Sequence, residues 1–579
     1  MSMFRSAPRR RLGLLAGATT VLLLASMLAA GPAPALTPCT TPPAVFPQAS
    51  LTPGTLGSGL TTLAGTAPSS FSFEVIGTIP DGWILGLDAI VIQIIGPASF
   101  LNETGGVFFG MSGSPAYVSG MLAGAVSGVF WDDATFGVLT PAEAMLEVLD
   151  AAERPVQTAR TIVPTEAIRR EIARIQGVSV SSVTGTFEQL PTPLAVSGLT
   201  ETKIAELQAR LDQRGENFWV HSAASAPTTT AEVTAQQFVP GEPLGAAIAY
   251  GDASYYATGT ATFTCGDYVV AFGHPFFWDA PGEISLGLSG AEGLMVLKGS
   301  GWPGYRFALL TESRGAIVQD RFAGIVGVVG MTPPSVPIVS DLTNLDSGDS
   351  RVGTTEAVHT WGWWLEEIVW SHLWANFAAV FGHFGGGSSS LGWTLEGTTA
   401  QGPFSVSNRW MASSEWDASE TIWRMVYAID QLQFNGFEDV TFTDISTTGS
   451  ITVERLDGQI GHVRVASTTQ PKLRARDLLK ARPGDVVTIE ITFEKPEGET
   501  VSTVEFEVPK KAKGTLEVSL RGGKERNRYR VNSFDELLDM LSGGEHPNDL
   551  VVSGVGRALR FEQGVIVRGK DRFWVKIVR

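Results

Sequence analysis

The stretch that decides the fold reads Gly105-Gly106-Val107-Phe108-Phe109-Gly110-Met111-Ser112-Gly113-Ser114-Pro115. Ser112 is the third residue of a Gly-x-Ser-Gly-x-Pro turn, and a strand-like run follows the proline. A serine hydroxyl is a weak nucleophile unless a base accepts its proton, and acyl transfer also needs backbone N–H donors for the developing oxyanion. Glycines on both sides let the backbone turn tightly enough for the N–H groups of Gly110 and Ser112 to form that oxyanion hole.

A different serine motif, the Gly-x-Ser-x-Gly elbow, leads from a strand into a helix. Here Ser114 stands where the elbow has its second glycine, and Pro115 leads into the β-like run Ala116 to Val118. The elbow is therefore excluded, and the turn predicts a serine site within a β structure.

The residues around the turn extend the pattern, since Glu103-Thr104-Gly105-Gly106 precedes it and Gly124-Ala125-Val126 follows it. In this region the sequence resembles the peptidase S55 family of SpoIVB-type sporulation serine proteases. The resemblance implies a serine endopeptidase related to the chymotrypsin-like two-barrel proteases, with Ser112 as the nucleophile. It implies a protein or peptide substrate and no cofactor or metal.

A histidine segment far downstream, Ala271-Phe272-Gly273-His274-Pro275-Phe276, resembles the Gly-His segment of the same family. The strand-like run Gly259 to Thr262 precedes it, and a third similar stretch, Val318 to Arg321, leads into Gly324 to Gly327. The resemblance implies that His274 is the base for Ser112. Taken alone, a histidine between glycine and proline is more often a turn residue.

The chain departs from the family in its order, because Ser112 precedes His274 whereas the sporulation enzyme has its histidine first. In a two-barrel fold the two groups come from different lobes, so an exchange of lobe order can preserve the geometry.

The acidic member of a triad is harder to find, because the aligned position of the family's acid is Pro97. Asp320 is the best replacement, since it lies 46 residues after His274 (320 − 274) within the same predicted lobe. Asp88 and Asp267 are weaker candidates. A Ser–His dyad without a carboxylate is another alternative, because removal of the acid slows a triad without abolishing it.

A rival function comes from another class of protein. A non-catalytic exported binding or scaffold protein can keep the fold after losing the acid. The missing family aspartate favours this rival, while the presence of both Ser112 and His274 favours the protease.

The N-terminus has the pattern of an export signal. Four arginines, Arg5 and the run Arg9 to Arg11, precede the apolar run Leu12 to Ala30, and Ala33-Pro34-Ala35 offers a small-residue cleavage site. A Sec or twin-arginine signal peptide over residues 1–35 fits this pattern, and an uncleaved membrane anchor is the alternative. Its removal takes away the four arginines and changes the net charge from −17 to −21, which disfavours a nucleic-acid partner.

The chain has two cysteines, Cys39 and Cys265. An even number of cysteines behind an export signal predicts a disulfide that ties the mature N-terminus to the strand before His274. Two unpaired buried thiols are the alternative.

The length of 579 residues exceeds the size at which one core stops growing, so several domains are expected. A hydrophobic fraction of 44%, with Gly 65 and Pro 32, suits a turn-rich, mainly β architecture. We expect a chymotrypsin-like two-lobed β-barrel protease module with the lobe order exchanged, a small helical connector and β-rich C-terminal domains. The predicted boundaries are a signal peptide at 1–35, a serine lobe at 36–159, a helical connector at 160–235, a histidine lobe at 236–345, a helix plus β-rich domain at 346–470 and a C-terminal β-rich domain at 471–579.

Four helices are predicted from caps and periodicity. Thr140-Pro141-Ala142-Glu143 is a capping-box sequence, and Ser533-Phe534-Asp535-Glu536 is a second one. The connector should hold two amphipathic helices, Glu166 to Ile175 and Glu201 to Gln213, each stopped by a glycine.

An amphipathic helix is also expected from Trp361 to Phe384. Its acidic and histidine residues exclude a lipid-facing span. A flexible break is expected at Gly385 to Ser390. Further along, Val486 to Phe493 and Val501 to Val508 predict a β-hairpin.

Overall fold

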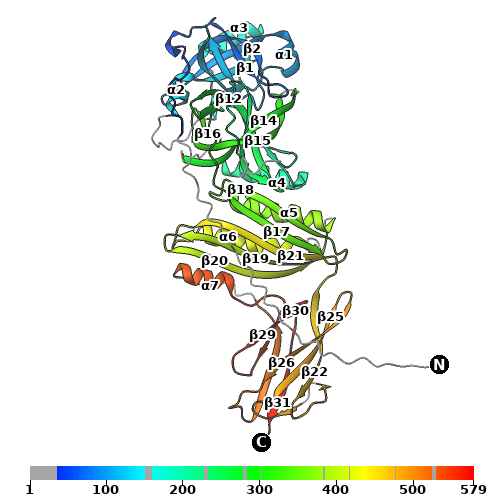
Figure 1. Cartoon of the computed structure of the whole chain (residues 1–579). Helices are drawn as coiled ribbons and strands as arrows, with labels where there is room; N and C mark the ends of the chain where they lie inside the picture. Colours follow the sequence, from blue (N-terminus) through cyan, green and yellow to red (C-terminus); the bar gives the residue numbers. More distant parts are fainter. Residues whose placement is uncertain are drawn as a thin grey trace, which may run out of the picture. The chain divides into compact units, whose positions relative to one another are not determined.

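The computed structural model describes residues 36–149, 160–226, 233–277, 283–299, 302–382, 385–415, 418–475, 478–524 and 530–579 (Figure 1). The predicted signal peptide, residues 1–35, lies outside these ranges. The chain is mainly β, with 49% strand and 17% helix, as the composition predicted. All elements below belong to one compact unit, Pro38–Arg579.

The first six long strands form a closed antiparallel barrel. They pair in the order β4-β1-β2-β3-β6-β5, and the pairing of β4 with β5 closes the ring. Between β3 and β4 the chain passes through the short helix α1 (Ala98–Thr104) and the Ser112 turn. The strands are β1 (Leu56–Thr61), β2 (Ser69–Ile84), β3 (Leu87–Gly96), β4 (Pro115–Val118), β5 (Met121–Phe130) and β6 (Phe136–Pro141).

Alternation along β2 explains why this barrel closes around an apolar core. Phe71, Phe73 and Val75 point inward and are buried. Gly57 and Gly59 of β1 face the first two rings, and a Cβ at either glycine would lie 2.3 Å or less from a ring carbon. The rings therefore need the glycines opposite them, as is usual where aromatic residues pack across a strand pair.

Six later strands form a second antiparallel ring. Their pairings run β11-β12-β13-β16-β15-β14 and return to β11. The prediction of a two-barrel, chymotrypsin-like module is thereby confirmed. The strands are β11 (Pro243–Gly251), β12 (Tyr255–Cys265), β13 (Tyr268–Ala271), β14 (Glu283–Leu297), β15 (Tyr305–Arg321) and β16 (Gly324–Val329).

A connector joins the two barrels, and its two predicted helices are confirmed. The Thr165 side chain caps α3 by accepting from Ile168 N, and Gly177 and Gly215 end α3 and α4 at φ 68° and 79°. One connector strand pairs with the first barrel (β8 with β5) and another with the second (β9 with β12). The elements are β7 (Thr161–Ile162), α3 (Glu166–Gln176), β8 (Phe187–Gln189), β9 (Thr192–Val196), α4 (Glu201–Arg214) and β10 (Phe218–Ser222).

The second barrel continues into further strands without a break in hydrogen bonding. β18 pairs with β11, and the sheet then runs through β17, β21, β19 and β20. Strands on both sides of the boundary predicted near residue 345 thus belong to one sheet. The elements are β17 (Val336–Asn344), β18 (Ser350–Ala357), α5 (Trp364–Phe381), β19 (Gly387–Thr399), β20 (Gly402–Ser414), α6 (Ile422–Gln433) and β21 (Thr441–Thr452).

Two predictions in this region were wrong. The helix α5 is not amphipathic, because polar residues such as Glu367, His372 and Asn376 are buried together with its apolar ones. They are satisfied by neighbours, for example His372 by the hydroxyls of Thr355 and Ser340 at 2.9 and 3.0 Å. The expected flexible break at Gly385 to Ser390 is largely strand, since β19 begins at Gly387 and pairs with β20 and β21.

The C-terminal region contains two five-stranded sheets around a separate apolar core. The predicted hairpin is confirmed by β25 and β26, and the predicted helix by α7, whose cap Ser533 accepts from Glu536 N at 3.2 Å. The elements are β22 (Asp457–Ser467), β23 (Arg474–Ala475), β24 (Leu479–Ala481), β25 (Val486–Lys495), β26 (Gly498–Glu507), β27 (Thr515–Gly522), α7 (Phe534–Ser542), β28 (Asp549–Ser553), β29 (Leu559–Glu562), β30 (Ile566–Arg568) and β31 (Lys570–Ile577).

Within the described ranges, every helix is too short or too polar to cross a membrane.

Candidate active site

The Ser112 turn lies at the end of the first barrel that faces β12 of the second barrel. Gly110 and Gly113 adopt φ values of 90° and 89°, which favour glycine. A Cβ at Gly113 would lie 2.1 Å from Thr260 O, so the close approach of the second barrel also requires glycine. Thr260 N donates to Ser112 O at 2.9 Å, and Thr262 Oγ1 donates to Gly113 O at 2.7 Å.

His274 follows β13 of the second barrel at a sharp bend. Phe272 and Gly273 both have positive φ, 69° and 68°. The carbonyl of Gly273 accepts a hydrogen bond of 2.7 Å from Thr140 Oγ1, at the end of β6 in the first barrel. Each barrel therefore holds the loop of the other that carries a candidate catalytic residue.

The predicted capping box at residues 140–143 does not form, so this prediction was wrong. The helix α2 (Ala142–Glu147) does form, but its N-cap is Pro141 and no side chain caps it. The Thr140 hydroxyl is engaged with Gly273 O, and Glu143 accepts instead from Gln48 N at 2.8 Å. Sequence reasoning missed the role of Thr140 because its partner is 133 residues away.

The structure brings Ser112 and His274 together, with 2.8 Å between Oγ and Nε2. Nδ1 of the same imidazole lies 2.7 Å from Pro275 O, and a carbonyl can only accept. The proton of the neutral ring is therefore on Nδ1, and Nε2 accepts from the serine hydroxyl. Burial lowers the pKa of His274 to about 4, so this neutral form is the one present at neutral pH.

The loop before Ser112 leaves two backbone donors available. Among the hydrogen bonds of the described residues, none uses the N–H of Gly110 or of Ser112. Arg306 N donates to Phe109 O at 2.9 Å and so fixes the orientation of the peptide unit that carries the Gly110 N–H. These are the two donors that the sequence predicted for an oxyanion hole.

Asp320 of β15 is buried beside the histidine loop, but it contacts the main chain rather than the ring. Its two carboxylate oxygens accept from Phe276 N and Phe277 N, both at 2.8 Å. Burial raises the pKa of Asp320 to about 7, against the lowering effect of these two amides. Nδ1 of His274 is bonded to Pro275 O, so Asp320 does not bind the imidazole. Its carboxylate instead anchors the main chain of the segment that follows the histidine.

The weaker acid candidates lie in other surroundings. Asp88 binds Gln48 Nε2 at 2.5 Å and Asp81 N at 2.8 Å, and Asp267 is in the turn between β12 and β13.

Arg306 is a buried residue near the site that sequence reasoning did not identify. Its guanidinium donates to Thr62 O at 3.1 Å and to Gly259 O at 2.6 Å, and no ion pair within the described residues involves it. A Cβ at Gly110 would be 3.6 Å from its Nε. Burial lowers the pKa of Arg306 to about 9. The available signal was its inward position in the alternating strand β15.

The disulfide Cys39–Cys265 is present, with the Cα atoms 4.8 Å apart. It attaches the segment before the first barrel to the end of β12, whose Thr260 and Thr262 hold the Ser112 turn. The pairing therefore adds a covalent tie beside the hydrogen bonds between the barrels.

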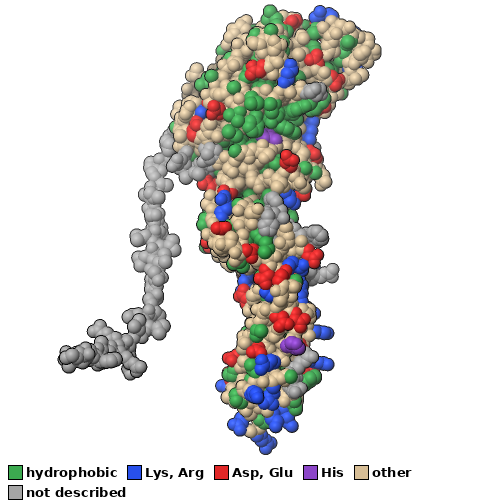
Figure 2. Space-filling model, turned by 90° about the vertical axis from the view of Figure 1, so that its right-hand side faces the viewer, with side chains coloured by type: hydrophobic (Ala, Val, Ile, Leu, Met, Phe, Trp, Pro, Cys, Tyr) green, Lys and Arg blue, Asp and Glu red, His purple; other side chains and the backbone are tan. Residues whose placement is uncertain are grey.

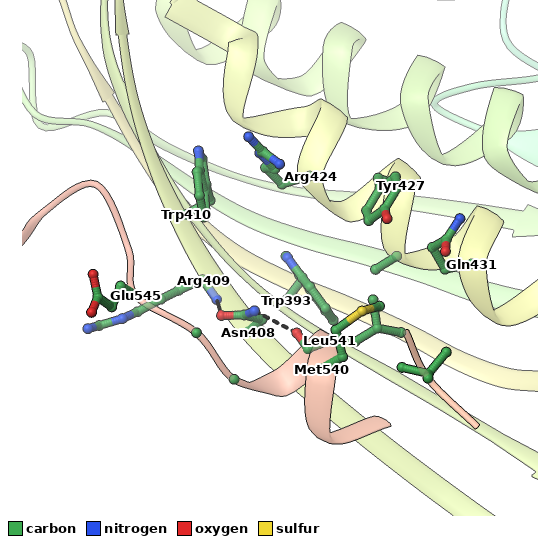
Figure 3. Close-up of a pocket in the computed structure, with 14 residues that line it drawn as sticks. Trp393, Asn408, Arg409, Trp410, Arg424, Tyr427, Gln431, Met540, Leu541 and Glu545 are labelled. Atoms are coloured by element: carbon green, nitrogen blue, oxygen red, sulfur yellow. Dashed lines mark hydrogen bonds between the residues drawn. The ribbon is translucent and has the colours of Figure 1, made fainter. Parts of the chain in front are cut away.

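A separate hollow of about 460 Å³ lies between β19, β20, α6 and the end of α7 (Figure 3). Arg424 lies over the ring of Trp410 at 4.2 Å, and Trp393, Tyr427 and Leu541 also line it. None of its elements carries Ser112 or His274.

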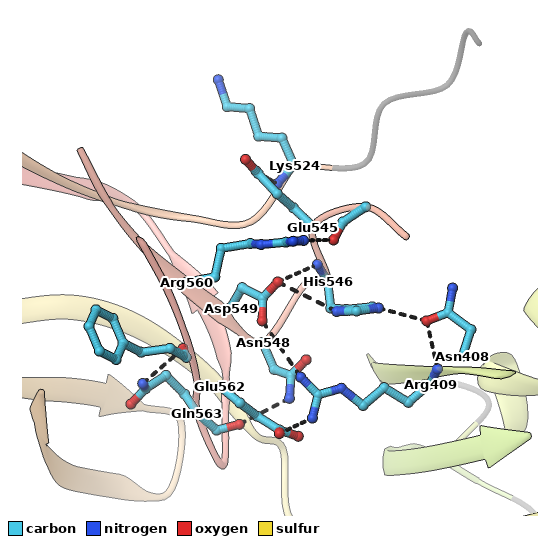
Figure 4. Close-up of polar contacts among 12 residues, drawn as sticks. Asn408, Arg409, Lys524, Glu545, His546, Asn548, Asp549, Arg560, Glu562 and Gln563 are labelled. Carbon is cyan, nitrogen blue, oxygen red and sulfur yellow. Dashed lines mark hydrogen bonds and ion pairs between the residues drawn. The ribbon is translucent and has the colours of Figure 1, made fainter. Parts of the chain in front are cut away.

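Polar contacts beside this hollow connect β20 to the C-terminal region (Figure 4). Asn408 binds Leu541 O at 2.6 Å and His546 Nε2 at 2.7 Å, and Arg409 pairs with Glu562. These contacts account for the packing of α7 and the following loop on β20. In the described part of the chain, no cluster of three or more His, Cys, Asp or Glu side chains is arranged to hold a metal ion.

Comparison with known proteins gives one match. The family model described as SpoIVB peptidase S55 matches residues 58–146. This segment covers most of the first barrel and includes Ser112, and it ends before the histidine loop. No curated protein and no solved structure matches the chain. The family match supports a peptidase of the serine type.

Proposed function

We propose that this chain is an exported serine endopeptidase that cleaves protein substrates through an acyl-enzyme on Ser112. The observation that carries the proposal is the 2.8 Å hydrogen bond between Ser112 Oγ and His274 Nε2, in the tautomer that makes Nε2 the acceptor. The export signal predicted at residues 1–35 and the disulfide, which forms in oxidising compartments, support export.

In the proposed reaction, Ser112 Oγ attacks the carbonyl carbon of the scissile peptide bond while its proton moves to His274 Nε2. The N–H groups of Gly110 and Ser112 would stabilise the oxyanion that forms. His274 then gives the proton to the leaving amine, and the C–N bond breaks. A water molecule, deprotonated by the same nitrogen, hydrolyses the ester and restores the serine.

In this scheme Pro275 O accepts the hydrogen bond from His274 Nδ1–H that a carboxylate accepts in a triad. The proposed catalytic unit is therefore a Ser112–His274 dyad. The low pKa of His274 means that the imidazolium is costly in this buried site, so we expect turnover to be slower than with a full triad.

A non-catalytic exported binding or scaffold protein is the second candidate function. It is favoured by the burial of both groups, since Ser112 and His274 are 2% and 3% exposed, and by the carbonyl in place of a carboxylate at Nδ1.

Labelling with a fluorophosphonate probe separates the two functions. We expect one adduct by intact mass on the wild-type protein, mapped to Ser112, and none on Ser112→Ala or His274→Ala. Ser114→Ala is the matched control, because Ser114 is buried in the same turn and bonds to Thr61 Oγ1 at 2.8 Å. Equal labelling of wild type and Ser112→Ala would contradict the protease.

A further inference from the structure

The connector strand β10 is the edge strand of the large sheet. On one side it pairs in parallel with β9. On its other side Gln208 of α4 donates from Nε2 to Phe218 O at 2.9 Å and accepts from Val220 N at 2.7 Å. One side-chain amide thus occupies the positions at which the peptide group of a neighbouring strand would bond.

This edge strand contacts the loops of both candidate catalytic residues. The ring of Phe218 lies 5.4 Å from Phe276 and 5.7 Å from Phe277, in the segment that follows His274. The ring of Trp219 lies 6.3 Å from Phe109, three residues before Ser112. A chain bound along β10 would therefore run beside both loops.

A cavity of about 600 Å³ lies between β10 and α4. Phe109, Trp131 and Trp219 form an aromatic wall, and Ile204 and Ala205 line it from the helix. The aromatic cluster continues to Trp302, which is 39% exposed and lies 6.0 Å from Phe109. Hydrophobic side chains gather on one face of the two-barrel region in Figure 2. A volume of this size accepts a large side chain together with adjoining main chain.

We propose that the outer edge of β10 and this cavity bind an extended segment of a protein substrate. The substrate main chain pairs with β10 in place of Gln208, and a large aromatic or aliphatic side chain enters the cavity. This inference rests on the proposed function, because it identifies the cavity as the substrate-binding part of the same site.

The charges around the cavity narrow the substrate class further. Its lining contains three carboxylates, Glu201, Asp212 and Glu216, and one cation, Arg160. A segment with neutral or basic residues beside the apolar one suits this rim, and an acidic segment does not.

The cavity is tested by peptide binding to the Ser112→Ala protein, which needs no turnover. The probe is a fluorescent blocked peptide, acetyl-Ala-Lys-Phe-Ala-Lys-amide, followed by anisotropy. Ala205→Trp fills the cavity from an exposed helix position and should weaken binding about tenfold or more, the scale expected for burying an aromatic side chain. Ala209→Trp is the matched control, exposed on the same helix and outside the lining, and should bind like the parent.

The strand edge is tested separately. Gln208→Ala removes the competing amide and should tighten binding by about two- to tenfold, whereas the exposed Gln213→Ala should have no effect. A peptide with N-methylated main chain should lose this gain. Equal binding to Ala205→Trp and its parent, or equal binding of a peptide with Asp in place of Phe, would overturn the proposal. Peptide binding without fluorophosphonate labelling of the wild type would instead refute only the protease function.

Discussion

Replacing Thr140 by valine tests whether the first barrel positions the histidine of the second. Valine has nearly the same shape as threonine but no hydroxyl, so Gly273 O would lose the 2.7 Å hydrogen bond and remain buried without a donor. Leaving a buried carbonyl unsatisfied costs about 1–3 kcal/mol, and we expect the free energy of unfolding to fall by this amount. Because His274 directly follows Gly273, the imidazole should also shift relative to Ser112.

The expected kinetic effect is of the same size in free energy as the effect on stability. A displacement of about 1 Å in a catalytic group can cost about 10² in rate. We would measure the fluorophosphonylation rate of Ser112 and the urea unfolding midpoint on the same preparation. Thr140→Ser keeps the hydroxyl and should retain a rate near that of the wild type, with the loss limited to the methyl group.

Two outcomes would refute this reasoning. The first is a Thr140→Val protein with the wild-type labelling rate, which would mean that the histidine loop holds its position without the hydroxyl. The second is a loss in Thr140→Ser as large as that in Thr140→Val, which would mean that keeping the hydroxyl is not sufficient to hold the histidine loop in place.

Three further predictions concern the acid, the base and the disulfide. Asp320→Asn should change turnover per folded molecule by less than about tenfold, because His274 Nδ1 is bonded to Pro275 O and not to this carboxylate. A loss of turnover near 10⁴ with an unchanged melting temperature would instead make Asp320 the triad acid. The acid limb of the pH profile of kcat/KM should lie near pH 4 rather than 6.5, because His274 must be neutral to accept a proton and burial lowers its pKa to about 4. A limb at pH 6.5 would contradict the assignment of this buried histidine as the base. Reduction of Cys39–Cys265, which are separated by 226 residues, should lower the free energy of unfolding by up to about 5 kcal/mol in thermal or urea denaturation, and an unchanged midpoint would contradict it.

Much of the fold could be predicted from the sequence because the signals for its strands and helices are local. Alternating apolar residues in β2, the Ser533 cap and the glycines that end α3 and α4 each act within a few residues. The features that were predicted wrongly depend on distant neighbours. The buried polar face of α5 needs hydroxyls from β17 and β18 (Ser340 and Thr355), and these cannot be read from the helix itself.

The candidate site shows the same division. The glycine-rich turn and the family resemblance pointed to Ser112, and the resemblance pointed to His274, before their 2.8 Å contact was seen. The partner of His274 Nδ1 could not be predicted, because the order of residues in the chain shows only which carboxylates are near the histidine in sequence. Here a carbonyl of the next residue occupies that position, and Asp320 meets backbone amides instead.

Hydrogen bonds between the two barrels explain how Ser112 and His274 can be aligned whichever of them comes first in the chain. Thr260 and Thr262 of the second barrel hold the Ser112 turn, and Thr140 of the first barrel holds the bend before His274. Neither loop is fixed by its own barrel alone, so the 2.8 Å contact exists only when the two barrels are packed together. These reciprocal hydrogen bonds cross the interface directly, and the connector strand β10 adds contacts to both loops. A chain with its lobes in either order can therefore form the same pair, provided that both sets of hydroxyls are present.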